Sequence, residues 1–204
     1  LDTSGSMNLN IDVSPADDQW FHSTGVHLPE NNPRRARMLS EPTRLTVAKQ
    51  AFGGMLDTLH PDINTRLITF DGCYNQIDRG LFGQSQRDQL KRSVQQLGAN
   101  DGTPLASSLE LAASQVDGRL HDALVVMFVD GEDGCERNAC AVSRSIARQQ
   151  PRLRVNVVNI SDSELSNCIA ENTGGRVYTA RNAAEVSSML REASEEVSTD
   201  PSCP

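Results

Sequence analysis

Leu1-Asp2-Thr3-Ser4-Gly5-Ser6, at the start of the chain, places a carboxylate and two hydroxyls at alternate positions of one short stretch. These are hard oxygen ligands of the kind that Mg²⁺ prefers. A pattern of such common residues often arises by chance, so by itself it carries little weight. Two downstream segments could complete a site with it, and they are Asp101-Gly102-Thr103-Pro104-Leu105 and Val129-Asp130-Gly131-Glu132-Asp133.

The composition indicates a soluble chain of one domain. Its 204 residues suffice for a hydrophobic core without help from metal or disulfides, and 37% of them are hydrophobic. The formal net charge of −8 argues against nucleic acid as the main partner and fits a surface that attracts cations. No apolar run reaches the length of a membrane span, and the first residues do not form a signal peptide.

Five cysteines bear on the redox compartment. Cys135 and Cys140 bracket four residues, and this spacing leaves a zinc site and a short-range disulfide as alternatives. Zinc usually needs a second ligand pair, which is missing, so we favour a Cys135–Cys140 disulfide and an extracytoplasmic location, whether periplasmic, cell-surface or secreted. The pairing of Cys73 and Cys168 stays open. The odd count leaves at least one thiol over, and Cys203 in the tail is the candidate.

Helical and strand-like patterns alternate along most of the chain. Apolar residues spaced by three and four predict amphipathic helices, whereas continuous apolar runs predict strands buried on both faces of a sheet. A capping box at 161–164 opens a short helix that stops at Gly174-Gly175. The other expected helices are 43–59, 85–97, 105–116, 138–149 and 182–197, and the expected strands are 65–70, 76–80, 123–129, 153–160 and 177–179.

This alternation predicts a three-layer α/β domain, a Rossmann-like doubly wound sheet with helices on both faces. We expect the sheet to be mostly parallel, with one antiparallel edge strand from a hairpin of 65–70 and 76–80. Leu1 is at best the last residue of a truncated first strand, so we expect the sequence to be an excised fragment. Ligands bind outside the carboxyl ends of the strands in such sheets, and the three oxygen-rich segments can meet there.

We assign residues 1–198 to one domain and residues 199–204 to a tail or linker. Inside the domain, residues 7–42 form a long polar insertion directly after Ser6, rich in Pro, Asn and Asp. Segments of this length and composition are either mobile surface loops or functional lids. Both readings stay open for this insertion: a mobile surface segment, or a lid or specificity loop beside the oxygen-rich stretch.

With these three segments, the chain resembles a von Willebrand factor type A domain with a metal-ion-dependent adhesion site. Residues 2–6 match the family's Asp-x-Ser-x-Ser, residues 102–105 match its threonine loop, and Asp130-Gly131 match the aspartate after its central strand. The likeness covers nearly the whole chain apart from the insertion, the tail and the absent first strand. It is greatest to bacterial exported members, in which a Cys-x-x-x-x-Cys pair follows that aspartate, and it extends over residues 168–175.

The resemblance implies a site for Mg²⁺ or Mn²⁺. Three hydroxyls would bind the ion, and two carboxylates would act directly or through water. Because hydroxyls solvate an ion without neutralising it, a carboxylate from a partner protein can complete the shell. The implied function is a metal-dependent protein-binding module for adhesion or for assembly of the cell envelope. The five implied metal residues are Asp2, Ser4, Ser6, Thr103 and Asp130.

Two other functions compete with this one. A structural domain could use the ion only to fix its loops. A metal-dependent hydrolase would need a general base near the ion, yet every histidine lies outside the three segments, and no Gly-rich loop with lysine or Gly-x-Ser-x-Gly elbow is present. We therefore expect that the protein is not an enzyme. The histidines are His22, His27, His60 and His121.

Overall fold

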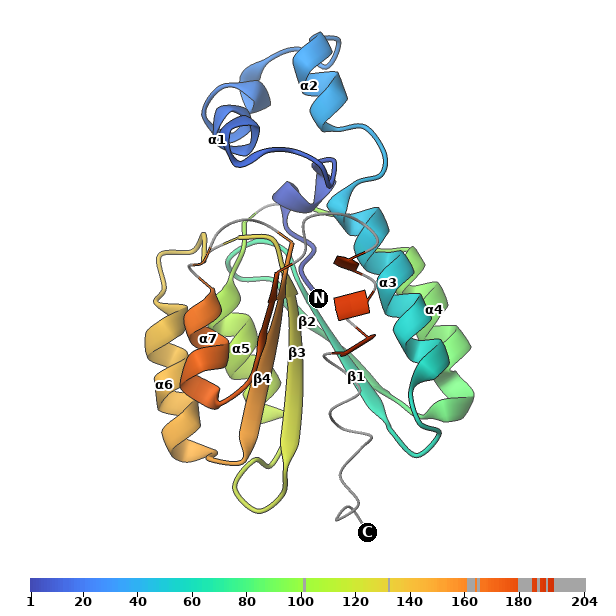
Figure 1. Ribbon diagram of the computed structural model, residues 1–204, viewed down its shortest axis with the longest axis vertical. Coiled ribbons are helices and arrows are strands. Elements are labelled where there is room, and N and C mark those ends of the chain that lie inside the picture. The colour runs from blue at the N-terminus through green and yellow to red at the C-terminus, as the bar shows by residue number, and fades with distance from the viewer. Residues whose placement is uncertain are drawn as a thin grey trace.

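The computed structural model describes residues 1–100, 102–131, 133–160, 164, 166–179, 185–186, 188–189 and 191–192. Its strands form an antiparallel pair and a parallel three-stranded sheet, in the order β1-β2 and β3-β4-β5. The mixed sheet with an antiparallel edge is therefore confirmed (Figure 1). The strands are β1 (Thr65–Phe70), β2 (Gln76–Phe82), β3 (Ala123–Val129), β4 (Leu153–Asn159) and β5 (Val177–Thr179).

Residues 1–3 lie between the two sheets and join them. The Thr3 amide donates to the Phe70 carbonyl of β1 (3.1 Å), and Asp2 forms a parallel bridge with the same residue. On the other side, the Asp2 amide donates to the Phe128 carbonyl of β3 (3.0 Å). Beyond Leu1, an apolar cavity of about 360 Å³ lies between β1 and β3. The order across the molecule is thus β2, β1, residues 1–3, β3, β4 and β5.

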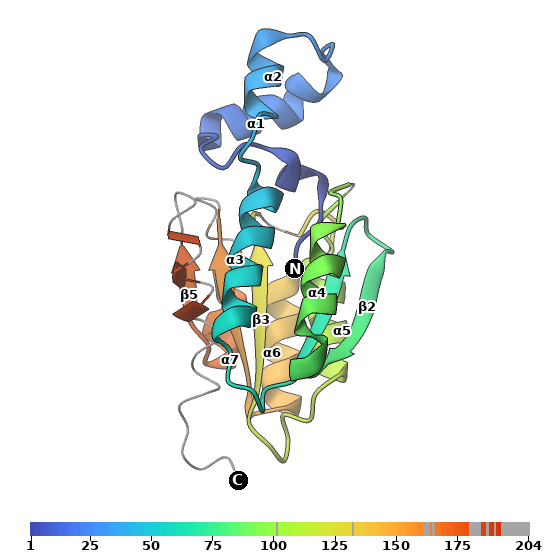
Figure 2. The ribbon, with the colours of Figure 1, turned by 90° about the vertical axis from the view of Figure 1, so that its right-hand side faces the viewer.

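Helices cover both faces of this sheet, which makes the three predicted layers (Figures 1 and 2). One buried cluster lies under α3 and α4, and a second lies under α5, α6 and α7. Alternate residues of β3 serve the two clusters: Phe128 packs into the first, and Met127 and Val129 pack into the second. The helices are α3 (Arg44–Thr58), α4 (Arg87–Gln95), α5 (Leu105–Ser114), α6 (Ala139–Gln149) and α7 (Asn167–Thr173).

Helix α3 shows why the sequence pattern predicted a helix correctly. The Thr43 hydroxyl accepts from the Thr46 amide and caps the helix, as expected for Thr at this position. Its apolar stripe is buried in the first cluster, and full burial of each large side chain contributes about 1.5–3 kcal/mol. The residues of this stripe are Leu45, Ala48, Phe52, Met55 and Leu56.

The insertion is folded, and in this respect the expectation of a polar loop was incomplete. It holds α1 (Pro15–Ser23), η2 (Gly25–His27) and α2 (Pro33–Met38), which stand above the end of the sheet in Figures 1 and 2. Ser14 caps α1 and Asn32 caps α2, each followed by proline at the first helical position. Ser-Pro and Asn-Pro are helix-start signals, and they could have revealed both helices from the sequence.

The disulfide prediction was wrong in its pairing. Cys73 bonds Cys135, with Cα atoms 5.3 Å apart, and Cys140 bonds Cys168, with Cα atoms 5.5 Å apart. Cys135 lies in the loop after β3, beside the β1–β2 turn, whereas Cys140 lies in the first turn of α6 and meets α7. Short spacing along the chain indicated proximity, but the start of α6 directs the second cysteine away from the first.

Near the C-terminus, α7 begins at Asn167 rather than at the predicted capping box and ends at Gly174, whose φ of 69° is the left-handed conformation that glycine adopts readily. Residues 161–163 of that box lie outside the described residues, as do most of the predicted helix 182–197, Cys203 and the predicted tail. No helix among the described residues is long and apolar enough to cross a membrane.

Candidate metal centre

Four of the five predicted ligands lie together at the carboxyl edge of the sheet. The Ser4 amide donates to Asp2 Oδ1 at 2.8 Å, and the hydroxyl oxygens of Ser4 and Ser6 lie 3.1 Å apart. Ser6 Oγ in turn donates to Asp130 Oδ1 at 2.9 Å. A continuous line of polar contacts therefore joins the first loop to the loop after β3, across 124 residues of sequence.

The sheet positions both loops. Asp2 and Thr3 are held by β1 and β3 through their amides, and Thr3 Oγ1 also donates to the Phe70 carbonyl (3.0 Å). After Ser4 the chain leaves the sheet through the short 3₁₀ helix η1 (Gly5–Asn8), which Met7 anchors in the core with a fully buried side chain. Asp130 directly follows β3, whose last three residues are buried. Parallel strands ending at one edge thus bring the two carboxylates together.

Burial makes both carboxylates costly to ionise. It raises the pKa of Asp2 from 3.8 to about 7, and the neighbouring charge of Asp130 adds to this rise. Burial also raises the pKa of Asp130, and the nearby charge of Arg44 and the hydrogen bond from Ser6 offset part of that rise. Among the described residues, the second oxygen of Asp2, Oδ2, is buried without a hydrogen-bond partner. An unpaired buried carboxylate oxygen is a position that a bound cation would satisfy.

The loop of Thr103 reaches the same edge through its backbone. The Asn100 amide donates to the Thr3 carbonyl (2.9 Å), and the Gly134 amide donates to the Thr103 carbonyl (2.9 Å). Within the described part of the chain, the Thr103 hydroxyl forms no hydrogen bond with the other four predicted ligands. The structure therefore brings its loop between the loops of Asp2 and Asp130 without linking the hydroxyl to them.

The Cys73–Cys135 disulfide supports this threonine loop from the outside. A Cβ atom placed on Gly102 would lie 3.6 Å from the sulfur of Cys73 and 3.7 Å from that of Cys135, so the loop packs directly on the bond. The Gly72 amide also donates to the Gly102 carbonyl (2.8 Å). The disulfide thus clamps together the β1–β2 turn and the loop after β3, with the threonine loop against them.

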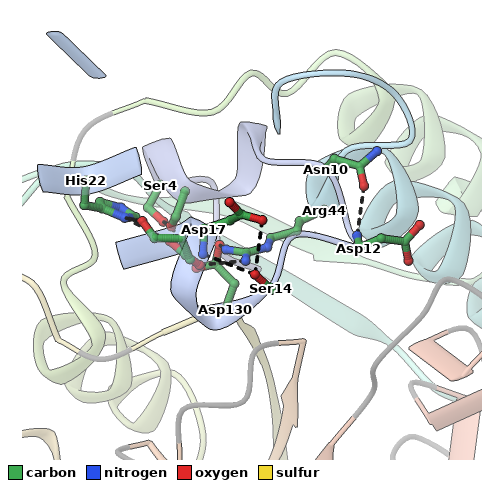
Figure 3. A network of polar contacts seen from close by, with 10 residues as sticks. Ser4, Asn10, Asp12, Ser14, Asp17, His22, Arg44 and Asp130 are labelled. Carbon is green, nitrogen blue, oxygen red and sulfur yellow. Dashed lines mark hydrogen bonds and ion pairs between the residues drawn. The ribbon is translucent and has the colours of Figure 1, made fainter. Parts of the chain in front are cut away.

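Arg44 is the residue of this centre that sequence reasoning missed. It is the first residue of α3, and its side chain is 3% exposed. Nη1 donates to Asp130 Oδ2 (3.0 Å), and Nη2 donates to Asp18 Oδ2 (2.7 Å) on α1 of the insertion. His22 Nδ1 lies 2.9 Å from the other oxygen of Asp18. Figure 3 shows Arg44, His22 and Asp130 in this network. The only sequence signal was a basic residue in the first turn of a helix, where positive charge is unfavourable.

Asp133 accepts backbone hydrogen bonds that stabilise the loops near the centre. Its two carboxylate oxygens accept from the Ala106 amide (2.8 Å) and from the Cys135 amide (2.8 Å). Pro104 precedes α5 and offers no side-chain cap, so the carboxylate of Asp133 caps this helix from a different loop. Asp133 thus ties the loop after β3 to the start of α5.

The residues present fit a divalent cation. Asp2, Ser4, Ser6 and Asp130 combine two carboxylates with two hydroxyls, which is an oxygen donor set suited to a hard ion. Oδ2 of Asp2, which lacks a partner in the described part of the chain, and the guanidinium on Asp130 both show that this edge favours positive charge. The described residues contain no group of three or more His, Cys, Asp or Glu that could hold a metal, so any ion here depends on the hydroxyls.

The raised pKa of Asp2 predicts how the stability of the metal-free protein depends on pH. The folded state keeps the Asp2 proton up to about pH 7, whereas the unfolded chain loses it near pH 4. The unfolded state therefore binds fewer protons between these values, and the contribution of Asp2 to stability falls as pH rises from 4 to 7. Denaturant titrations in EDTA should give a flatter profile for Asp2→Asn. A wild-type profile no steeper than that of the variant would contradict the prediction.

No protein family and no curated protein matches the chain by sequence. Solved structures do resemble it. BatB from Bacteroides thetaiotaomicron superposes with a TM-score of 0.68 at 16% identity, covering 98% of this chain and 96% of that one. A von Willebrand factor type A protein from Catenulispora acidiphila matches with a TM-score of 0.61 at 17% identity, over 74% of this chain and 38% of the other. The fold is of the von Willebrand factor type A kind.

A third similar structure holds a metal. It is proximal thread matrix protein 1 from the mussel byssus, described with a zinc-occupied metal-ion-dependent adhesion site motif. The TM-score is 0.60 at 14% identity, and the match covers 96% of this chain and 43% of that one. At these identities the comparisons establish the fold of the chain, and the chemistry of its site has to be argued from its own residues.

Proposed function

We propose that the protein is a metal-dependent protein-binding module that acts in adhesion or assembly. Asp2, Ser4, Ser6, Thr103 and Asp130 would hold Mg²⁺ or Mn²⁺, and the ion would supply a positive centre for a carboxylate of a partner protein. The observation that carries the proposal is the buried Oδ2 of Asp2, which has no hydrogen-bond partner among the described residues and lies beside two hydroxyls and Asp130. The zinc-occupied motif of the mussel protein supports a divalent ion at this edge of the fold.

The chain's own residues prepare this site in two ways. The hydrogen bonds from Ser4 to Asp2 and from Ser6 to Asp130 orient the carboxylates before any ion arrives. Because two of the oxygen donors are neutral hydroxyls, a bound divalent ion would keep part of its charge and attract an acidic group from outside. We also propose an extracytoplasmic location, which the two disulfides support because such bonds persist in oxidising compartments.

A structural domain with a loop-fixing ion is the second candidate, because the centre joins loops that also share a disulfide. It predicts that the ion raises the melting temperature without promoting association with any acidic protein. We propose no enzymatic role. Among the described residues, His22 pairs with Asp18, and no histidine forms a hydrogen bond with the four clustered ligands.

Calorimetric titration with Mg²⁺ and Mn²⁺ tests the proposed site. We expect saturable one-site binding by the protein and its loss in Asp2→Ala, because that change removes the carboxylate with the free oxygen. Thr103→Ala should also abolish binding if the hydroxyl joins the ion's shell. The matched control is Asp12→Ala, which removes an exposed carboxylate from the nearby insertion. Absence of binding by the folded wild-type protein, or equal loss in the control, would overturn the proposal.

A further inference from the structure

We propose that Arg44 is a resident cation of this centre: it competes with the divalent ion for Asp130 and, through Asp18, couples the ion's arrival to helix α1 of the insertion. This inference rests on the proposed function, since it concerns the same site. It assigns a regulatory task to a residue outside the five predicted ligands and to the insertion above them. On this proposal, the insertion responds to the binding of the divalent ion.

The first step concerns the two oxygens of Asp130. Ser6 donates to Oδ1, and Arg44 donates to Oδ2 from a side chain that is 3% exposed. A divalent ion that binds Asp130 would therefore arrive within a few ångströms of a buried guanidinium. Like charges at such a distance repel strongly in a poorly solvated site. Arg44 must lose contact with Asp130 or weaken the binding of the ion.

The second step concerns how firmly Arg44 is held. Its Nε is buried without a hydrogen-bond partner among the described residues, so the guanidinium is incompletely satisfied. A buried ion pair with an unmet donor contributes little net stability, because desolvation offsets the attraction. Such a pair can be replaced by a stronger competitor for the same carboxylate. This is the behaviour expected of a displaceable cation rather than of an optimised structural pair.

The third step concerns the link to the insertion. Arg44 Nη2 donates to Asp18, which belongs to α1 and is 21% exposed. Two backbone hydrogen bonds close the base of the insertion. The Arg44 amide donates to the Leu9 carbonyl (2.8 Å), and the Ile11 amide donates to the Pro42 carbonyl (3.0 Å). A change at Asp130 therefore reaches α1 through one side chain. Figure 3 shows Arg44 between Asp130 and the residues of α1.

The insertion contains a second Arg–Asp pair that serves as a matched control. Arg34 on α2 donates to Asp17 on α1 at 2.7 Å, but these side chains are 42% and 27% exposed. In the described part of the chain, Asp130 forms no hydrogen bond or ion pair with either of these side chains. This pair joins the two helices of the insertion to each other and not to the centre. Its removal should affect the insertion without altering the affinity of the site for metal.

The experiment measures Mn²⁺ affinity by calorimetry and amide hydrogen exchange in residues 15–23. We expect Arg44→Gln to bind Mn²⁺ about tenfold or more tightly than wild type, because a neighbouring positive charge is removed. Arg44→Lys, which keeps the charge, should stay near the wild-type affinity. Asp18→Asn should weaken binding several-fold, because Arg44 is then less neutralised. Arg34→Gln and Asp17→Asn should leave the affinity unchanged.

Amide hydrogen exchange measures the coupling between the bound ion and helix α1. In wild type, Mn²⁺ should accelerate exchange in residues 15–23 several-fold, and Asp18→Asn should abolish this response. If Arg44→Gln binds Mn²⁺ as wild type does or more weakly, Arg44 merely positions Asp130, and the inference is overturned while the proposed function stands. If no variant binds Mn²⁺, the proposed function fails. In that case, the amide exchange of residues 15–23 without metal tests the link between Arg44 and α1. The link is refuted if Arg44→Gln and Asp18→Asn leave that exchange unchanged.

Discussion

Replacing Asp130 by alanine is expected to lower the free energy of unfolding of the metal-free protein by about 3–5 kcal/mol. The change removes a carboxylate that is completely buried and leaves Arg44 with Asp18 as its one charged partner among the described residues. Ser6 loses its acceptor at the same time. Urea denaturation in EDTA measures the effect, and metal binding should be lost together with the stability.

Two controls separate this effect from the loss of any carboxylate. Asp130→Asn keeps a hydrogen-bond acceptor and should destabilise the protein less than alanine does. Glu110→Ala breaks an ion pair with Arg137 in which the side chains are 48% and 43% exposed, and such pairs contribute about 0–1 kcal/mol. If Asp130→Ala costs no more than Glu110→Ala, the prediction fails, because leaving the buried Arg44 without this partner then carries no extra cost.

Replacing both Cys73 and Cys135 by serine is expected to destabilise the protein by about 4 kcal/mol and to weaken metal binding. The bond closes a loop of 62 residues and carries the threonine loop on its two sulfurs. Without it, Gly102 loses the surface on which it packs, and the β1–β2 turn separates more easily from the loop after β3. Thermal unfolding and calorimetry with Mn²⁺ measure the two consequences.

The second disulfide provides the comparison. Cys140 and Cys168 join α6 to α7 across 28 residues, and the chain-entropy model assigns this shorter loop about 0.7 kcal/mol less stabilisation. Removing it should therefore destabilise the protein nearly as much while leaving the Mn²⁺ affinity within about twofold of wild type. Equal weakening of metal binding by both pairs of substitutions would show that general stability, and not support of the threonine loop, sets the affinity.

Much of the fold could be predicted because the relevant signals are local. The apolar run of 123–129 forms β3 with the predicted bounds, and helix α3 begins and ends within one residue of its predicted bounds. The alternation of these elements restricted the topology to a doubly wound sheet. In such a sheet Asp2 and Asp130 had to end at one edge, so the contact of the two loops was predictable from their positions after strands.

Other features depended on contacts that no local pattern encodes. The pairing of Cys135 with Cys73 follows from how the turn after β1 meets the loop after β3, and the spacing to Cys140 suggested the wrong partner. The helices of the insertion had local signals at Ser14 and Asn32, but nothing in their sequence indicated that α1 would direct Asp18 toward the site.

The amino-acid sequence by itself determined the layers of this protein, the order of most of its elements and the oxygen-rich residues at one edge of its sheet. Periodicity of 2 and 3.6 residues and capping chemistry act over a few neighbours, so they can be read along the chain. Only the tertiary structure decided the disulfide partners, the unsatisfied oxygen of Asp2 and the bridge from Asp130 through Arg44 to Asp18. Burial and pairing depend on where separate elements meet, and the free energy of a polar or charged side chain is set by that environment.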